Sequence, residues 1–342
     1  MKKLGSSGIN YIIAWACVFG LIELFLYLLF KFNPGSIFSW QYYDEAFKKA
    51  KLPTYSYGWT SSEPMPRPGD VETASRCAAA FGDSFTYAEE LEAKDAWSNQ
   101  ASRLLNCKIE NYGVGGFGTD QAYLLYREKK PKAPIVIVGI YPEMLKRNLA
   151  ASWIFYGGTP DQSLKPFFYL NKGHLEQHPL PQDSSVAEIK NYHSHDYFYQ
   201  PYKLAFPYTI ETAKSLIKNG INRFTDGKYS GLANIPQAIE LQDAIMARMR
   251  EDILENGSKI AVLFYPTVAE AESGRFKYTE YINHYRALHP NDCVIEVGRA
   301  LNQAFKEKNI SLNAGSGHYS KQANLVIAHE VIRQLRSCQY LQ

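Results

Sequence analysis

Residues 76–84 read RCAAAFGDS. After Arg76 the run CAAAF is apolar, which is typical of a short buried strand, and Gly82-Asp83-Ser84 ends that run with turn-forming residues. A serine in this position lies at the carboxyl end of a strand, where open α/β sheets hold their functional sites. Because Asp and Ser are also favoured helix N-caps, the tripeptide alone is equally typical of an ordinary cap.

The same alternation of apolar strand and helix recurs along the chain. Strands are expected near 77–82, 107–112, 135–140, 259–264 and 293–297. Helices are expected near 89–105, 120–130, 235–255, 277–288 and 320–335. The strand at 135–140, IVIVGI, is apolar throughout, as in a parallel sheet covered on both faces. The pattern predicts an α/β fold with a single parallel five-stranded sheet and helices on both faces.

Composition excludes several classes of protein. The 342 residues are 46% hydrophobic and 21% charged, which excludes a disordered chain. The net charge is +3, from 37 basic and 34 acidic residues, and the charges are interspersed, so we expect no nucleic-acid partner. The mean hydropathy of −0.31 excludes a protein with many membrane spans.

Residues 1–32 form a separate unit. Residues 11–30 are apolar except for Glu23 and span about 30 Å as a helix, the thickness of one bilayer core. We expect an uncleaved transmembrane anchor, because a signal peptide has a shorter apolar run and a small-residue cleavage motif. Lys2 and Lys3 favour a cytoplasmic N-terminus. Glu23 is costly in lipid. Either it faces a partner helix in the membrane, or a single Glu is tolerated in a long span.

The rest of the chain divides into a linker and one domain. Residues 33–74 are proline-rich and predict an extended linker, and residues 75–342 hold the α/β domain. Residues 150–232 break the alternation and are rich in aromatic residues, so we interpret them as an insertion. Within them, 193–196 (HSHD) has a metal-like composition, but a tyrosine-rich loop favours packing, and we expect no metal site.

Two further motifs can carry chemistry. Residues 111–119 (NYGVGGFGT) follow the second strand, and Gly116 within them can aim an N–H group at an oxyanion. Their G-x-G-x-x-G spacing also fits a phosphate-binding loop, although no acidic ribose partner follows. His318 precedes the last helix, in the stretch 315–320 (GSGHYS), from which a histidine can reach a serine as its base. Alone, it is more typical of a capping or solvent-exposed histidine.

The cysteines leave two alternatives. Cys17 lies inside the apolar span, and Cys77 and Cys107 open neighbouring strands. Outside the cytoplasm these two thiols can pair. We favour buried free thiols, which are common in protein cores.

Together, Gly82-Asp83-Ser84-Phe85, the stretch 111–118 and the late Gly-His-Tyr-Ser resemble the SGNH/GDSL hydrolase superfamily over about residues 76–338. The run GDSFT and the phrase NYGVGGFGTDQ are similar to membrane-anchored members associated with bacterial envelope polysaccharides. The resemblance implies that Ser84 is the nucleophile and His318 the general base. It implies an oxyanion hole from the N–H groups of Ser84 and Gly116, and it requires no cofactor or metal.

The chain departs from the family pattern at two positions. The family usually has Asp three residues before the histidine, where this chain has Gly315, and Asn in a Gly-x-Asn-Asp block, which is missing from residues 139–144 here. Glu143 and Asn148 are the nearest polar pocket residues. The chain therefore runs a Ser–His dyad, uses an acid from elsewhere, or is a weak catalyst.

The resemblance implies a periplasmic or extracellular ester hydrolase or O-acyltransferase, held by a single-pass anchor in the bacterial inner membrane. Its expected partner is an acylated carbohydrate, with acetyl as the expected acyl group of an envelope or exported polysaccharide. The alternative is a catalytically degenerate module that binds polysaccharide or a membrane partner through the anchor.

Overall fold

The structure is a computed structural model of the full chain. It describes residues 6–32, 47–48, 50–53, 55, 57–58, 66–69, 71, 75–153, 164–199, 206–210, 212–214 and 236–341. The linker predicted at 33–74 therefore falls largely outside the described residues.

The domain is built on one five-stranded parallel sheet, as predicted. Its strands are β1 (Arg76–Gly82), β2 (Lys108–Gly113), β3 (Ile135–Ile140), β6 (Lys259–Phe264) and β7 (Cys293–Glu296). Their spatial order is β2-β1-β3-β6-β7, and every pair is parallel. The expected strand boundaries agree with the observed ones to within one residue, because each strand is an apolar run closed by turn residues.

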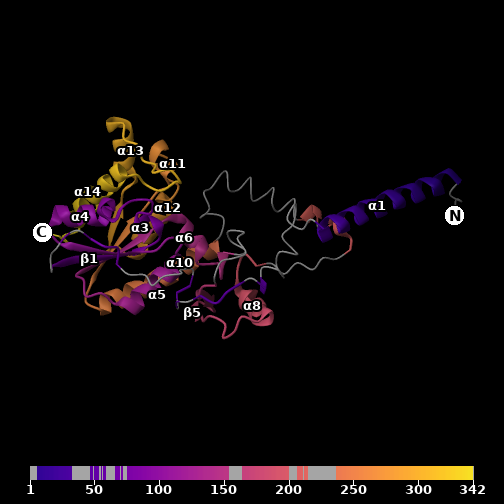
Figure 1. The fold of residues 1–342 in the computed structure, drawn as a ribbon, viewed down its shortest axis with the longest axis horizontal. Helices are drawn as coiled ribbons and strands as arrows, with labels where there is room; N and C mark the ends of the chain where they lie inside the picture. The colour runs from indigo at the N-terminus through magenta and orange to yellow at the C-terminus, as the bar shows by residue number, and fades with distance from the viewer. Residues whose placement is uncertain are drawn as a thin grey trace.

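Helices cover both faces of this sheet (Figure 1). One layer contains α4 (Trp97–Leu105), α13 (Gly298–Lys308) and α14 (Lys321–Ser337). The other contains α5 (Thr119–Lys129), α10 (Pro236–Glu255) and α12 (Thr279–Leu288). Successive strand residues alternate between the layers: Ala78 and Ala80 pack with the first, and Ala79 and Phe81 with the second. The sheet is therefore buried on both sides.

The helix expected over residues 89–105 is shorter than predicted. It begins only at Trp97, after a turn and a 3-10 helix at Ala93–Asp95. Ala88 and Glu90 have positive φ angles of 61° and 70°, which no right-handed helix accommodates. This turn follows the one-turn helix α3 (Ser84–Tyr87) and directs its side chains back toward the end of β1.

Several helices were not predicted, among them α3, α6 (Pro142–Arg147), α11 (Val268–Ser273) and α13. Between α6 and α10 the structure describes an antiparallel hairpin of β4 (Phe167–Asn171) and β5 (His174–His178), followed by α8 (Val186–Tyr192). Later in the insertion the structure describes helical residues at 208–210 and 212–214.

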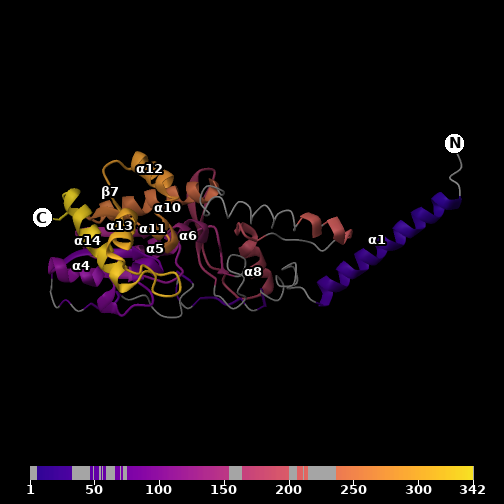
Figure 2. The same cartoon turned by 90° about the horizontal axis from the view of Figure 1, so that it is seen from above.

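Helix α1 (Ser6–Phe32) projects away from the α/β domain (Figure 2). Its residues Gly8–Leu29 are long and apolar enough to cross a membrane, a property that a signal sequence near the N-terminus shares. Most of its large apolar side chains are exposed, including Trp15, Leu21 and Phe25. A surface of this kind is stable only when something apolar covers it.

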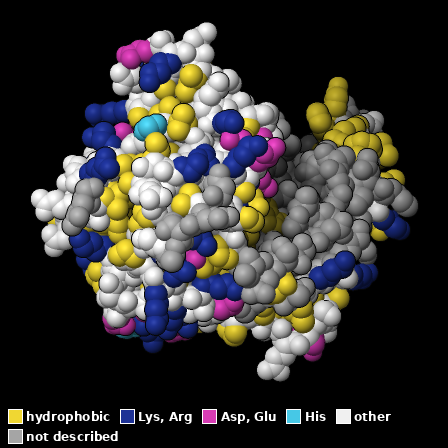
Figure 3. Space-filling view, turned by 60° about the vertical axis from the view of Figure 1, so that its left-hand side comes forward, with side chains coloured by type: hydrophobic (Ala, Val, Ile, Leu, Met, Phe, Trp, Pro, Cys, Tyr) yellow, Lys and Arg dark blue, Asp and Glu magenta, His cyan; other side chains and the backbone are white. Residues whose placement is uncertain are grey.

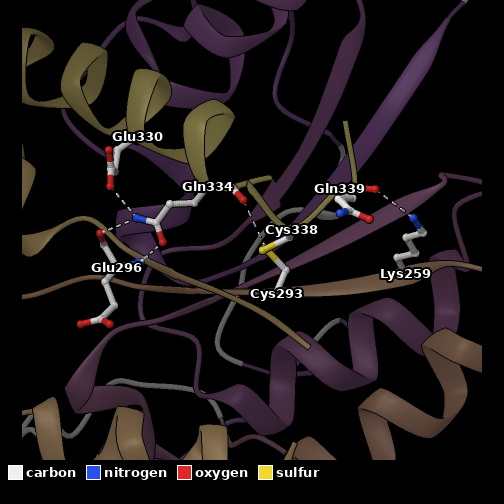
Figure 4. Close-up of a disulfide and its surroundings, with 7 residues drawn as sticks. All are labelled: Lys259, Cys293, Glu296, Glu330, Gln334, Cys338 and Gln339. Atoms are coloured by element: carbon white, nitrogen blue, oxygen red, sulfur yellow. Dashed lines mark hydrogen bonds between the residues drawn. A yellow bond between two sulfur atoms is a disulfide. The ribbon is translucent and has the colours of Figure 1, made fainter. Parts of the chain in front are cut away.

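Two disulfides tie the domain, so the expectation of free thiols at Cys77 and Cys107 is wrong. Cys77 and Cys107 are bonded, because the parallel pairing of β1 with β2 brings their Cα atoms to 5.7 Å. The second disulfide joins Cys293 at the start of β7 to Cys338 after α14 (Figure 4). Cys17 is free.

The second disulfide belongs to a C-terminal clasp on the edge strand. The Gln334 amide oxygen accepts from the Glu296 N–H at 3.1 Å, and its NH₂ group donates to the Glu296 carbonyl at 2.8 Å (Figure 4). The side chain thereby occupies backbone groups that an edge strand otherwise leaves open. The C-terminal end of helix α14, whose N-terminal loop carries His318, is thus fixed to the sheet.

We predict that protein exported through the membrane carries one free thiol, at Cys17, of the five cysteines. Thiol titration after denaturation without reductant measures this number. Cys293→Ser with Cys338→Ser should lower the free energy of unfolding by about 2–5 kcal/mol, because the unfolded chain regains the entropy of a long loop. The matched control Cys17→Ser should leave it unchanged. Five reactive thiols in the exported protein would contradict the prediction.

Candidate active site

Ser84 begins α3, directly after β1. The preceding Asp83 is its N-cap and accepts the Phe85 N–H at 3.0 Å. The helix lies so close to the sheet that a Cβ atom at Gly139 would stand 2.1 Å from the Thr86 Oγ1. Glycine at the end of β3 is therefore needed for this approach. The result is a serine held at the carboxyl edge of the sheet, with its N–H at a helix N-terminus where no intrahelical partner exists.

His318 lies next to Ser84. Its Nε2 is 2.9 Å from the Ser84 Oγ. The loop that carries it is fixed by the Asn313 side chain, which accepts the N–H groups of Gly315 and Gly317. The ring of Phe85, adjacent to the serine, lies 5.1 Å from the imidazole, centroid to centroid. Two residues far apart in the sequence thus meet at hydrogen-bond distance.

An acid on the other ring nitrogen comes from Glu90, which sequence analysis did not identify. The His318 Nδ1 is 2.9 Å from the Glu90 Oε1. The second oxygen, Oε2, accepts the Ser316 N–H at 3.4 Å. A Cβ atom at Gly315, where the family usually has its Asp, would stand 4.0 Å from the same Glu90 oxygen. Glu90 lies on the turn that follows Ser84, not on the loop that carries His318. Its carboxylate nevertheless occupies the region next to Gly315, where the family usually has its Asp.

The three side chains define the histidine tautomer. A carboxylate only accepts hydrogen bonds, so Nδ1 carries the proton and Nε2 presents a lone pair to the Ser84 hydroxyl. Glu89 adds a second carboxylate, with its Oε2 3.7 Å from Nε2. An imidazolium formed at His318 is thus flanked by two negative charges. The His318 side chain is 21% exposed, whereas Ser84 is 5% exposed, so the histidine is the more open member of the pair.

Beneath the serine lies a buried ion pair. The Arg147 Nη1 donates to the Asp83 carboxylate at 3.2 Å and to the Phe117 carbonyl at 3.1 Å. Burial raises the pKa of Asp83, and the charge of Arg147 offsets part of that effect. Glu143 contacts the same guanidinium from the exposed side at 3.3 Å. Glu143 therefore has a partner of its own and, among the described residues, forms no hydrogen bond or ion pair with Ser84 or His318.

Asn148 is directed away from the serine. Its amide oxygen accepts the Asp120 N–H at 3.1 Å, and its NH₂ group donates to Gln242 at 2.7 Å. The side chain is fully buried. It holds α5 to α10, and its contacts give it no place among groups that reach a substrate at Ser84.

Gly116 follows β2 with φ of 78°, a backbone conformation that favours glycine. Among the described residues its N–H has no hydrogen-bond partner. A Cβ atom there would stand 3.0 Å from the ring of Trp153. The loop therefore leaves one donor available beside the Trp153 ring, and such a donor can bind an oxyanion.

A second Ser–His pair shows what this geometry needs besides distance. The Ser152 Oγ and the His193 Nε2 are also 2.9 Å apart, but both side chains are fully buried. The His193 Nδ1 contacts the Ile189 carbonyl instead of a carboxylate, and burial lowers the pKa of His193 to about 4. This pair is packing. In the described part of the chain no group of His, Cys, Asp and Glu could hold a metal ion.

Comparison with known proteins gives structural resemblances only. No protein-family model matches the chain. No curated protein matches it either. A member of the lipolytic protein G-D-S-L family from Veillonella parvula is 12% identical, with a TM-score of 0.39. The match covers 76% of this chain and 97% of that one. Solved structures named for the G-D-S-L family are thus among those that the chain resembles.

Two further solved structures, named as an esterase and a hydrolase, have similar sequence identities and TM-scores. An acetylxylan esterase from Geobacillus stearothermophilus is 11% identical with a TM-score of 0.42, over 78% of this chain and 95% of its own. An alpha/beta hydrolase enzyme from the metagenome of Lake Arreo is 10% identical with a TM-score of 0.43, over 80% and 100%. The geometry above is independent of these resemblances.

Arg67 holds the turn that carries Glu90. This buried side chain donates through Nη1 to the carbonyls of Tyr87 and Ala88, the latter at 2.7 Å, and through Nη2 to the carbonyl of Leu91. Its guanidinium also lies 4.2 Å from the centre of the Tyr87 ring. One side chain therefore satisfies three carbonyls of an irregular turn that has few backbone bonds of its own.

We predict that Arg67→Met lowers the free energy of unfolding by about 1–3 kcal/mol, because it leaves buried carbonyls without donors. Urea denaturation measures the loss, and hydrogen exchange at residues 87–91 should become faster. The matched control is Arg103→Met, since Arg103 is exposed and donates to the carbonyl of Lys94 at the surface. Its effect should stay within about 0.5 kcal/mol. Equal losses in both variants would contradict the role of Arg67.

Proposed function

We propose that the chain is a serine-dependent ester hydrolase or O-acyltransferase that acts on acyl esters, with acetyl as the first candidate, of an envelope or exported polysaccharide. The observation that carries this proposal is the hydrogen-bonded series Ser84–His318–Glu90, with 2.9 Å at both contacts. A nucleophile, a base and an orienting acid in this order are the arrangement of nucleophilic acyl transfer.

In the proposed reaction, His318 Nε2 takes the hydroxyl proton as Ser84 Oγ attacks the ester carbonyl carbon. The tetrahedral intermediate collapses, and the leaving alkoxide takes the proton from His318. The acyl group is then bonded to Ser84 Oγ. Water or a sugar hydroxyl repeats the sequence and releases the acyl group as an acid or a new ester. The Glu90 carboxylate accepts the hydrogen bond from the His318 Nδ1–H throughout the reaction and stabilises the imidazolium.

The negative charge of the tetrahedral intermediate needs donors. The N–H of Ser84, at the start of α3, and the N–H of Gly116 are the proposed oxyanion hole. The N-terminus of a helix and a free backbone donor both favour an anion. Asn148, bonded to Asp120 and Gln242, is not a third donor in this proposal.

The location we propose is outside the cytoplasm, with α1 as a single-pass anchor in the inner membrane. Two features support it. Helix α1 is long and apolar enough to span a bilayer, and disulfides such as Cys77–Cys107 and Cys293–Cys338 persist in oxidising compartments. An enzyme in that place meets exported and envelope polymers, which is the reason for an acylated polysaccharide as the substrate class.

The alternative, a catalytically degenerate binding module, rests on the missing Asp and the missing Asn. The Glu90 carboxylate contacts the His318 Nδ1 in place of the Asp, which weakens the first of these two reasons. The Asn has no replacement in this proposal, because the amide of Asn148 bonds to Asp120 and Gln242. The described residues give no separate observation in favour of a binding-only function.

We expect a fluorophosphonate probe to label the wild type at Ser84 and to leave Ser84→Ala unlabelled. On a small acetyl ester, Ser84→Ala and His318→Ala should each abolish turnover, and the double variant should be no worse, because the two residues act as a unit. Glu90→Gln should lower kcat by about 10²–10⁴-fold, since it removes the charge that orients the imidazole.

The matched control is Glu89→Gln, a neighbouring carboxylate of the same size that contacts only the Nε2 side, at 3.7 Å. We expect a loss of less than about tenfold there. No turnover and no labelling of folded wild-type protein would overturn the enzymatic proposal. Equal effects at Glu89 and Glu90 would overturn the assignment of the acid.

The anchor has its own test. An alkaline phosphatase fused after residue 342 should be active in a bacterial host, and a cytoplasmic reporter fused at the same point should be inactive, because α1 would carry the domain across the membrane. Deletion of residues 1–32 without a replacement signal should reverse both results. An inactive phosphatase with an active cytoplasmic reporter on the full chain would contradict the topology.

A further inference from the structure

Glu23 is the buried charge of an otherwise exposed helix. Only 4% of its surface is exposed, whereas Leu21, two residues away, is 65% exposed. Its carboxylate accepts hydrogen bonds from the N–H groups of Tyr208 and Thr209, the latter at 3.0 Å, and from the Thr209 hydroxyl. The group that covers Glu23 is therefore a segment of the same chain, from the insertion.

This segment comprises the described residues 206–210 and 212–214, and its helical residues begin at Tyr208. Its first N–H groups have no partner within the helix, and Glu23 supplies one. Aromatic contacts flank the carboxylate on both sides. Phe206 meets Phe19 at 6.3 Å, and Tyr208 meets Tyr27 at 5.7 Å, ring centre to ring centre. The contact with α1 thus extends over about two turns of the helix.

The depth of the contact follows from helix geometry. The apolar stretch of α1 ends at Leu29, six residues after Glu23. At 1.5 Å per residue, Glu23 lies about 9 Å inside that end. If α1 spans a bilayer, the first turn of the 206–214 segment lies at the same depth, below the level of the headgroups.

The outward side of the segment suits that depth. Phe206, although its ring contacts Phe19 of α1, is 67% exposed, and Ile210 is 51% exposed. Figure 3 shows hydrophobic side chains gathered on the part of the molecule farthest from the α/β domain, at the upper right of the view. An apolar surface continuous with that of α1 would be costly in water and is stable against lipid chains.

We propose that residues 206–214 form a second membrane-inserted element, which enters the outer leaflet and is docked on α1 through Glu23. Its partner is the hydrocarbon of the lipid bilayer. The Glu23 carboxylate obtains three hydrogen-bond donors, and the first N–H groups of the segment obtain an acceptor. Polar groups at this depth in a membrane need such partners, because no water is present to bond them. The inference rests on the proposed anchor and is independent of the chemistry at Ser84.

The experiment uses the full chain in phosphatidylcholine vesicles, in a Cys17→Ser background that leaves no native free thiol among the described cysteines. A single cysteine is introduced and labelled with the fluorophore NBD. The three variants are Ile210→Cys in the segment, Leu21→Cys in α1, and Leu325→Cys at an exposed position of α14. We expect the probe at 210 to be quenched by nitroxide-labelled lipid as strongly as the probe at 21, within about twofold. The probe at 325 should be quenched only by aqueous iodide.

The outcomes separate the two proposals. Lipid quenching at 21 but iodide quenching at 210 would overturn membrane insertion of the segment and leave the anchor in place. Iodide quenching at both positions would overturn the anchor and the inference together. Adding Glu23→Leu should reduce lipid quenching at 210 at least twofold and leave position 21 unchanged, because α1 becomes more apolar. Unchanged quenching at 210 in that variant would overturn docking through Glu23.

Discussion

The site depends on one contact between the two ends of the α/β domain. His318 and Glu90 are 228 residues apart, and their 2.9 Å contact forms only when the parallel sheet is complete. Strand β1 delivers Ser84 and the turn with Glu90, and the loop before α14 delivers His318 to the same edge. The clasp of α14 on β7, by Gln334 and the Cys293–Cys338 disulfide, limits how far that loop can move. A structural change at either end of the domain therefore alters the contacts among Ser84, His318 and Glu90.

The sheet was predictable because its strands are short apolar runs with turn residues at their ends. IVIVGI at 135–140 has no polar position and fits only a strand buried on both faces. The helices were less completely predicted. Leu301, Ala304 and Phe305 have helical spacing, yet our prediction omitted α13. The hairpin β4–β5 carries mixed polar and aromatic residues, and its pairing depends on contacts with α10 that no local pattern contains.

Ser84 and His318 were named from short motifs, but Glu90 could not be, because its position depends on backbone geometry. A helix over 89–105 would direct Glu90 along the helix surface. Positive φ at Ala88 and Glu90, together with Arg67 on the carbonyls of the turn, redirects the side chain to the imidazole. Asn148 shows the reverse case: its place in the sequence is near the block where the family has Asn, but packing of α5 on α10 uses its amide. Polar residues near a site in sequence are thus poor evidence until their hydrogen bonds are known.

The two Ser–His pairs among the described residues differ in the surroundings of the histidine. Both pairs are 2.9 Å apart, so distance does not distinguish them. His193 is sealed in the insertion and bonded to a neutral carbonyl, and burial lowers its pKa to about 4, so an imidazolium is strongly disfavoured there. His318 is partly open and lies between two carboxylates, which stabilise the positive charge that proton transfer creates. A base in acyl transfer must become charged midway through each step. The environment of the second nitrogen, rather than the contact with serine, therefore decides which pair can act.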